Sequence, residues 1–260
     1  MKTKSVLVFA GVMLFCGLSM ADMKVHITYD RGAMIDAKNP SARDGALVLP
    51  QGTLSFSRIS RMDFEFGDGL TVQKCEALFN EGSFDRLEKS LAVALKPASS
   101  FARLPGNLDV YLTWQMKVQF WTGKYAEMSR TAEWLRQRNA QPSSLTGMYA
   151  ALALIEQGRS DEAAKMFALA ESAGTLSEPM ALFVRARLAM AKKEYRQALQ
   201  YLARIVVMYS QDPEWMPAAA LYEGLICKQT GGLEASGTIA KELIEKYPDG
   251  YWHGRAAELK

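Results

Sequence analysis

The sequence contains little of what metal and redox chemistry needs. Its 260 residues include only two histidines and three cysteines, too few for an extensive metal site or a disulfide framework. Charge of one sign is also scarce, because 31 basic residues face 28 acidic ones. This near balance argues against a dedicated nucleic-acid binder or a polybasic membrane-surface protein, both of which need a basic surface.

Motifs for catalysis are absent as well. The sequence has no G-x-S-x-G elbow, H-E-x-x-H pair, P-loop or G-x-G-x-x-G fingerprint. His26 and His253 lie in different parts of the chain and have no third ligand at metal spacing. We therefore expect a protein that is not an enzyme and that uses no cofactor and no metal ion.

The first 21 residues have the pattern of a secretory signal peptide. Lys2 and Lys4 precede an apolar run over residues 6–15, and small residues at positions 19 and 21 predict cleavage before Asp22. A transmembrane anchor is the alternative, but the run is shorter than the roughly 20 residues that a spanning helix needs. The bulky Phe15 before Cys16 argues against a lipid anchor. We expect an exported protein, periplasmic or secreted, with no membrane span after cleavage.

The mature chain changes character near residue 68. Residues 24–29 and 53–60 alternate polar and apolar side chains, residues 46–49 form a short apolar run, and residues 39–45 are typical of a loop. These features predict a small β-rich module over residues 22–68, in the form of a small barrel or curled sheet. From residue 69 to residue 260 the apolar residues follow helical spacing instead.

The helical part repeats itself. Five turn segments align when one position in each is superposed, with spacings of 41, 35, 35 and 38 residues: Gly82, Gly123, Gly158, Lys193 and Gly231. Small and aromatic residues follow at fixed offsets, most clearly Ala163, Phe167 and Ala170 after Gly158. Such a period predicts helix–turn–helix units that stack because no unit can bury its apolar stripe alone.

On these residues the chain resembles the tetratricopeptide-repeat (TPR) family, most strongly over residues 145–210. The resemblance implies a mainly α fold, an α-solenoid of about five TPR-like repeats after the β module. It also implies a concave groove formed by the first helix of each unit. The family's groove positions fall on Lys117, Trp121, Phe183, Arg187 and Lys228. Basic and aromatic groups there would suit an extended or acidic peptide.

The two cysteines beyond the leader are expected to be buried and unpaired. The repeat alignment places Cys75 and Cys227 in the first and fifth units. With helices packed about 10 Å apart, this separation is on the order of 40 Å. A disulfide needs Cα atoms within about 7 Å.

Together these features favour an exported, non-enzymatic adaptor that binds a protein or peptide partner in the cell envelope through its groove. Two alternatives remain open. One is a self-assembling structural protein whose end units stack between chains. The other is an accessory subunit of a wall-acting hydrolase, although paired catalytic carboxylates normally come from a separate domain for which this chain has no room.

Overall fold

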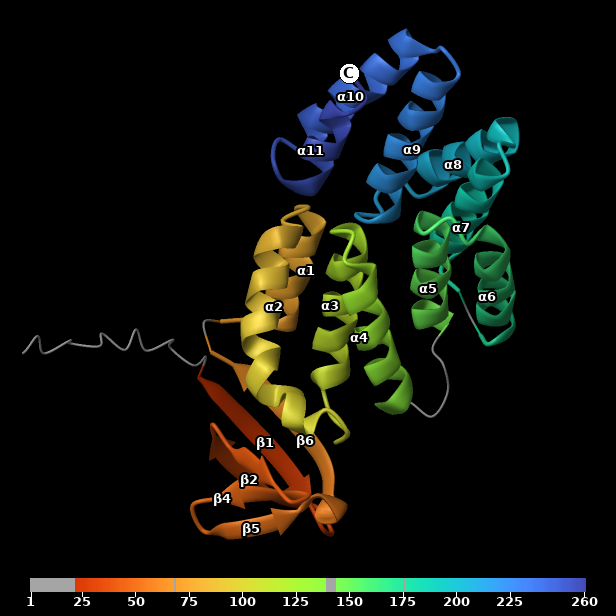
Figure 1. The fold of residues 1–260 in the computed structure, drawn as a ribbon. Helices are drawn as coiled ribbons and strands as arrows, with labels where there is room; N and C mark the ends of the chain where they lie inside the picture. Colours follow the sequence, from red (N-terminus) through yellow and green to blue (C-terminus); the bar gives the residue numbers. More distant parts are fainter. Residues whose placement is uncertain (1–21, 68, 139–143, 175) are drawn as a thin grey trace, which may run out of the picture.

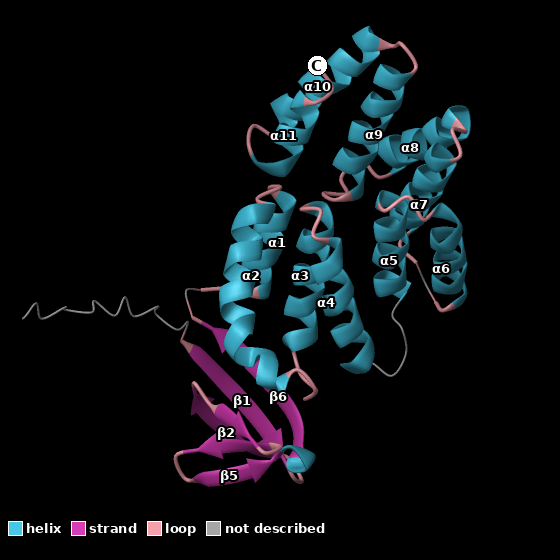
Figure 2. Ribbon diagram, in the orientation of Figure 1, coloured by secondary structure: helices cyan, strands magenta, loops and turns pink. Residues whose placement is uncertain are grey.

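The computed structural model describes residues 22–67, 69–138, 144–174 and 176–260 and shows a mainly helical protein with a small antiparallel β module at its N-terminal end (Figures 1 and 2). The predicted leader, residues 1–21, lies outside the described residues. No helix in the described part of the chain is long and apolar enough to cross a bilayer.

The β module consists of two three-stranded antiparallel sheets. Strand β1 (Met23–Tyr29) lies between β2 (Ala33–Lys38) and β6 (Ile59–Phe66), and β4 (Ala46–Leu49) lies between β3 (Ser41–Arg43) and β5 (Gly52–Ser55). Alternation predicted one strand over residues 53–60, but a short 3-10 helix, η1 (Phe56–Arg58), divides it. Residues 41–43, expected in a loop, pair with β4. The module is therefore two small sheets and not one curled sheet.

A loop of the helical part extends the first sheet along the free edge of β6. The N–H of Met62 donates to the carbonyl oxygen of Pro105 (2.8 Å), and the Asn107 side chain bonds both the N–H and the carbonyl oxygen of Phe64 (2.8 and 3.0 Å). Gly106 sits between these contacts with φ +153°, and a Cβ there would lie 1.8 Å from the Met62 oxygen. The close approach of the two segments therefore requires glycine.

The helices come in antiparallel pairs joined by short turns. The first helices of the pairs are α1 (Val72–Asn80), α3 (Leu108–Trp121), α5 (Ser144–Glu156), α7 (Glu178–Ala191) and α9 (Trp215–Gln229). The second helices are α2 (Phe84–Ala98), α4 (Tyr125–Arg138), α6 (Ser160–Ser172), α8 (Tyr195–Met208) and α10 (Leu233–Lys246). Each first helix contacts the first helix of the next pair. A short 3-10 helix, η2 (Ser99–Phe101), follows α2, and a last helix, α11 (Gly250–Ala257), packs on α9 and α10.

The five turns have the same backbone conformation. All the aligned positions have positive φ: Gly82 (+72°), Gly123 (+74°), Gly158 (+75°), Lys193 (+62°) and Gly231 (+91°). In each turn the next residue donates its N–H to the carbonyl oxygen five residues earlier, as in Lys124 to Gln119 (2.8 Å) and Glu194 to Ala189 (2.9 Å). This is the left-handed C-cap that satisfies the last carbonyl groups of a helix. The sequence alignment of the turns is confirmed, including the position occupied by lysine.

The core follows the predicted pattern of small and large side chains. Ala163 and Ala198 are fully buried on α6 and α8, and Phe167 and Leu202 are buried beside them. Small residues there let neighbouring helices approach closely, while the larger side chains fill the space between pairs.

The last helix, α11, lies beside the turn that joins α1 to α2 (Figure 1). There the N–H of Tyr251 donates to the carbonyl oxygen of Gly82 (2.8 Å).

Candidate functional site

Four of the five groove positions predicted from the sequence lie on the buried faces of α3 and α7, called here the inner side of the helices. Trp121 on α3 and Phe183 on α7 are 5% and 0% exposed, and their ring centroids lie 6.2 Å apart. Lys117 and Arg187, one turn away on the same helices, are also largely shielded from solvent. Lys228 on α9 does not join them: its ammonium donates to the carbonyl oxygen of Glu258 (2.6 Å) near the C-terminus.

The chain's own aromatic side chains fill the space in front of Trp121 and Phe183. Trp215, at the start of α9, lies 5.9 Å from Trp121 and 5.3 Å from Phe183, measured between ring centroids. Trp252 of α11 lies 5.0 Å from Trp121 and is 1% exposed. In this conformation Phe183 is therefore inaccessible to a partner, and only a small part of Trp121 remains accessible.

A buried carboxylate holds three helices together beneath these rings. Glu214, which precedes α9 and is 4% exposed, accepts hydrogen bonds from Lys117 Nζ (2.8 Å), from Trp121 Nε1 (2.9 Å) and from the Tyr149 hydroxyl of α5. The Lys117 ammonium also lies 5.1 Å from the ring centroids of Phe79 and Trp114, so it has aromatic as well as anionic neighbours. These hydrogen bonds replace the hydration that the carboxylate loses on burial, so its burial is tolerated.

A second buried ion pair lies on the same inner side. Arg187 donates from Nη1 to Glu156 of α5 (2.5 Å), and its guanidinium stacks over the ring of Tyr222 at 3.9 Å. The Tyr222 hydroxyl donates to the same carboxylate oxygen (3.3 Å). The predicted basic residue Arg187 is thus engaged within the chain, and it orients Glu156 at the wall of an open cleft.

This cleft, of about 350 Å³, is the solvent-facing part of the inner surface. Its walls combine aromatic rings with hydroxyl, carboxylate and guanidinium groups from six helices and a turn: Asp85, Phe120, Trp121, Thr122, Gly123, Tyr125, Glu156, Tyr222, Tyr251 and Arg255. A larger hollow of about 620 Å³ adjoins it between the start of α2 and α11 and shares Asp85, Tyr251 and Arg255. Trp121 is the only one of these lining residues that was predicted as a groove position, because the walls combine helices far apart in the chain, from α2 to α11.

The tyrosines of the cleft remain protonated at neutral pH. Burial raises the pKa of Tyr251 to about 12, and burial also raises the pKa of Tyr125, with the Glu156 carboxylate adding to that shift. The Tyr251 hydroxyl accepts a hydrogen bond from Arg255 (2.7 Å), so its own proton stays free for another acceptor. The cleft therefore offers hydroxyl donors, a carboxylate acceptor and apolar ring faces to one ligand, which is typical of binding sites.

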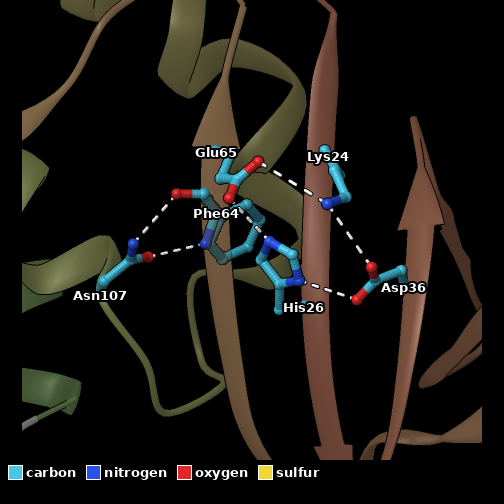
Figure 3. A network of polar contacts seen from close by, with 6 residues as sticks. All are labelled: Lys24, His26, Asp36, Phe64, Glu65 and Asn107. Atoms are coloured by element: carbon cyan, nitrogen blue, oxygen red, sulfur yellow. Dashed lines mark hydrogen bonds and ion pairs between the residues drawn. The ribbon is translucent and has the colours of Figure 1, made fainter.

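The exposed face of the first sheet carries a separate polar cluster (Figure 3). His26 of β1 bonds Asp36 of β2 (2.7 Å) and Glu65 of β6 (2.9 Å), while Lys24 lies 3.5 Å from Asp36 and 3.9 Å from Glu65. The hydrogen bonds to Glu65 and Asp36 raise the pKa of His26 above its ordinary 6.5. The cluster ties three strands together and, like the rest of the described chain, contains no group of side chains suited to hold a metal ion.

The two cysteines in the described residues are unpaired, as predicted. Cys75 of α1 is buried, and burial raises the pKa of its thiol to about 11. Cys227 of α9 is only half-buried, so the prediction of a buried thiol is wrong at that position. It lies near the C-terminal end of α9, next to the turn that joins α9 to α10.

No family model matches this chain, and no curated protein or solved structure matches it significantly.

Proposed function

We propose that this protein is an exported, non-enzymatic adaptor, a TPR-like α-solenoid that binds a protein or peptide partner of the cell envelope in the cleft of its inner surface. The observation that carries this proposal is the convergence of Tyr125, Glu156, Tyr222, Tyr251 and Arg255 around one open cleft. The side chains supply hydrogen-bond donors and acceptors beside ring faces, which is the combination that anchors peptide segments.

The repeat interpretation is supported by the five identical turns and by the successive packing of first helix against first helix. Such units present their first helices on a shared surface, where a bound segment can contact several of them at once. The cleft is the part of that surface left open by Trp215 and α11. Because Glu156 in its wall is held by Arg187, and Trp121 by Glu214, these side chains need little further ordering on binding, and this favours affinity.

Site-specific crosslinking in intact cells tests the proposal. A photoreactive phenylalanine analogue replaces Tyr125 in the cleft or Leu169 on α6, which is 64% exposed and outside the cleft. Melting curves first establish that both proteins fold. The adaptor function predicts that the same partner is captured repeatedly from position 125 and not from position 169.

A matched pair of charge reversals tests the dependence on the cleft. Asp85 and Asp161 are both exposed acids in the first turn of a second helix, but only Asp85 lines the cleft. Asp85→Arg should reduce partner capture from position 125, whereas Asp161→Arg should leave it unchanged. Capture that is equal at both crosslinking positions, or insensitive to Asp85→Arg, would overturn the proposal. Crosslinks only to other copies of the chain would favour self-assembly instead.

A further inference from the structure

A separate hollow of about 220 Å³ lies between η2 and the C-terminal end of α4, at the end of the helical part nearest the β module. Its walls include Ser100, Arg103, Trp134, Gln137 and Arg138. No carboxylate is among the described residues that line it. The hollow is remote from the cleft and shares no residue with it.

Arg138 has a buried guanidinium with one nitrogen unused. Its side chain is 4% exposed, Nε donates to Asp109 of α3, and Nη1 donates to the carbonyl oxygen of Ala102. Nη2 is buried and has no hydrogen-bond partner. A guanidinium carries five N–H donors, and a buried donor without an acceptor costs free energy. Arg138, which lines the hollow, therefore carries one guanidinium nitrogen whose N–H donors have no acceptor.

Arg103 adds a second guanidinium to the same hollow. It is exposed and forms no ion pair with any described residue. Asp109 balances Arg138, so the two arginines leave one unbalanced positive charge at the site. Trp134, which is 42% exposed, places a large apolar surface beside them.

We propose that this hollow binds a carboxylate group carried on an apolar body. The guanidinium of Arg103 and Nη2 of Arg138 bind the carboxylate oxygens, because planar guanidinium groups match the planar geometry of a carboxylate. The Ser100 hydroxyl donates a further hydrogen bond, and the apolar body packs on the Trp134 ring. One unbalanced positive charge matches a carboxylate, which carries a single negative charge, better than a phosphate with about −1.5 to −2. The carboxylate belongs either to the C-terminus of a peptide or to a small carboxylic acid.

Three probes distinguish these sources. N-acetyl-glycyl-phenylalanine presents a peptide C-terminus, its C-terminal amide lacks only the charge, and phenylacetate is a small acid of similar apolar character. Binding is followed through the NMR signal of the Trp134 indole N–H in the full chain. We expect the free peptide acid to shift this signal in a saturable manner and the amide to bind at least about tenfold more weakly, the equivalent of one charge-assisted hydrogen bond. Tighter binding of phenylacetate than of the peptide acid would identify a small acid as the source.

Arg103→Gln is the decisive variant, because the side chain is exposed and its replacement does not disturb the core. It should weaken binding of the preferred acid about tenfold, the effect of losing one charged donor. Arg136→Gln is the matched control, since Arg136 is an exposed arginine on α4 that pairs with Glu133 and does not line the hollow. This variant should bind the preferred acid with the same affinity as the unaltered protein.

Equal binding of the acid and the amide would overturn the proposal, as would an unchanged affinity of Arg103→Gln. Tighter binding of inorganic phosphate than of either acid would also overturn it, by showing a phosphate site. Failure of either acid to shift the Trp134 signal would show that Arg138 serves only to join α4, α3 and η2. None of these results depends on the adaptor function, because the cleft is not involved.

Discussion

The buried contact between Lys117 and Glu214 should couple the free-energy effects of changing the two residues. The carboxylate side chain is 6% exposed and the ammonium side chain 18% exposed, with 2.8 Å between Oε2 and Nζ. Glu214→Gln keeps an acceptor oxygen for Trp121 and Tyr149 but leaves the Lys117 charge without its partner. Lys117→Met leaves the carboxylate charge buried, and the double variant removes both charges at once.

The magnitude follows from the loss of one partner in a buried pair. Removing one member of such a pair costs about 3–5 kcal/mol in general. The partial exposure of Lys117 and the oxygen retained by glutamine reduce this, so we expect about 1.5–3 kcal/mol for Glu214→Gln, the usual range for a hydrogen bond to a charged group. Since the second change removes the charge that the first leaves unpaired, the double variant should be more stable than the sum of the single effects predicts. The expected coupling is about 1–2 kcal/mol.

Urea denaturation of the four proteins measures this coupling, provided that the slope m is unchanged. The control cycle uses Glu133→Gln and Arg136→Met, an exposed pair three residues apart on α4. Solvent screens that pair, so its cycle should show no measurable coupling. If the effects of changing Lys117 and Glu214 add to within about 0.5 kcal/mol, as for independent sites, the two buried charges do not stabilise each other.

Three further changes test the fold. Gly106→Ala should cost at least about 1–3 kcal/mol in thermal unfolding, because its Cβ would overlap the Met62 oxygen in a backbone region that disfavours alanine. Lys193→Gly should raise stability to urea by about 1 kcal/mol, since glycine adopts the left-handed turn without strain, whereas Lys192→Gly, at negative φ, should not. Two carboxylates raise the pKa of His26 in the folded protein, so the stabilising effect of His26 is complete below about pH 6.5 and is lost as the pH rises through this higher folded pKa. The urea midpoint should therefore decrease between about pH 6 and about pH 8, and it should decrease less in His26→Gln.

The sequence was most informative where structure depends on local spacing. The turns at Gly82, Gly123, Gly158 and Gly231 follow from glycine's tolerance of positive φ, and the alignment found the same turn at Lys193, where glycine is missing. The small and aromatic positions on α6 are buried as expected, because helical periodicity alone decides which side chains share a face.

Long-range pairings were not predictable in the same way. Glu214 lies 97 residues from Lys117, and nothing in the local pattern around either residue indicates that their charges meet. The open cleft has the same origin, since Asp85 of α2 and Arg255 of α11 come from opposite ends of the helical part. In the β module, alternation identified the strand after Gly52 but not its division at Phe56, because a short 3-10 helix leaves the side-chain pattern almost unaltered.

The return of α11 to the first helix pair changes how the helices depend on one another. In an open array of repeats each unit contacts only its neighbours, and stability is close to a sum of local terms. Here Tyr251 bonds the backbone at Gly82, and Trp252 packs between Phe84 and Trp121. These contacts link the last helix to the first two pairs, so that loosening either end exposes aromatic surface at the other. The same contacts form the rim of the cleft, and its shape therefore depends on both ends of the helical part being folded.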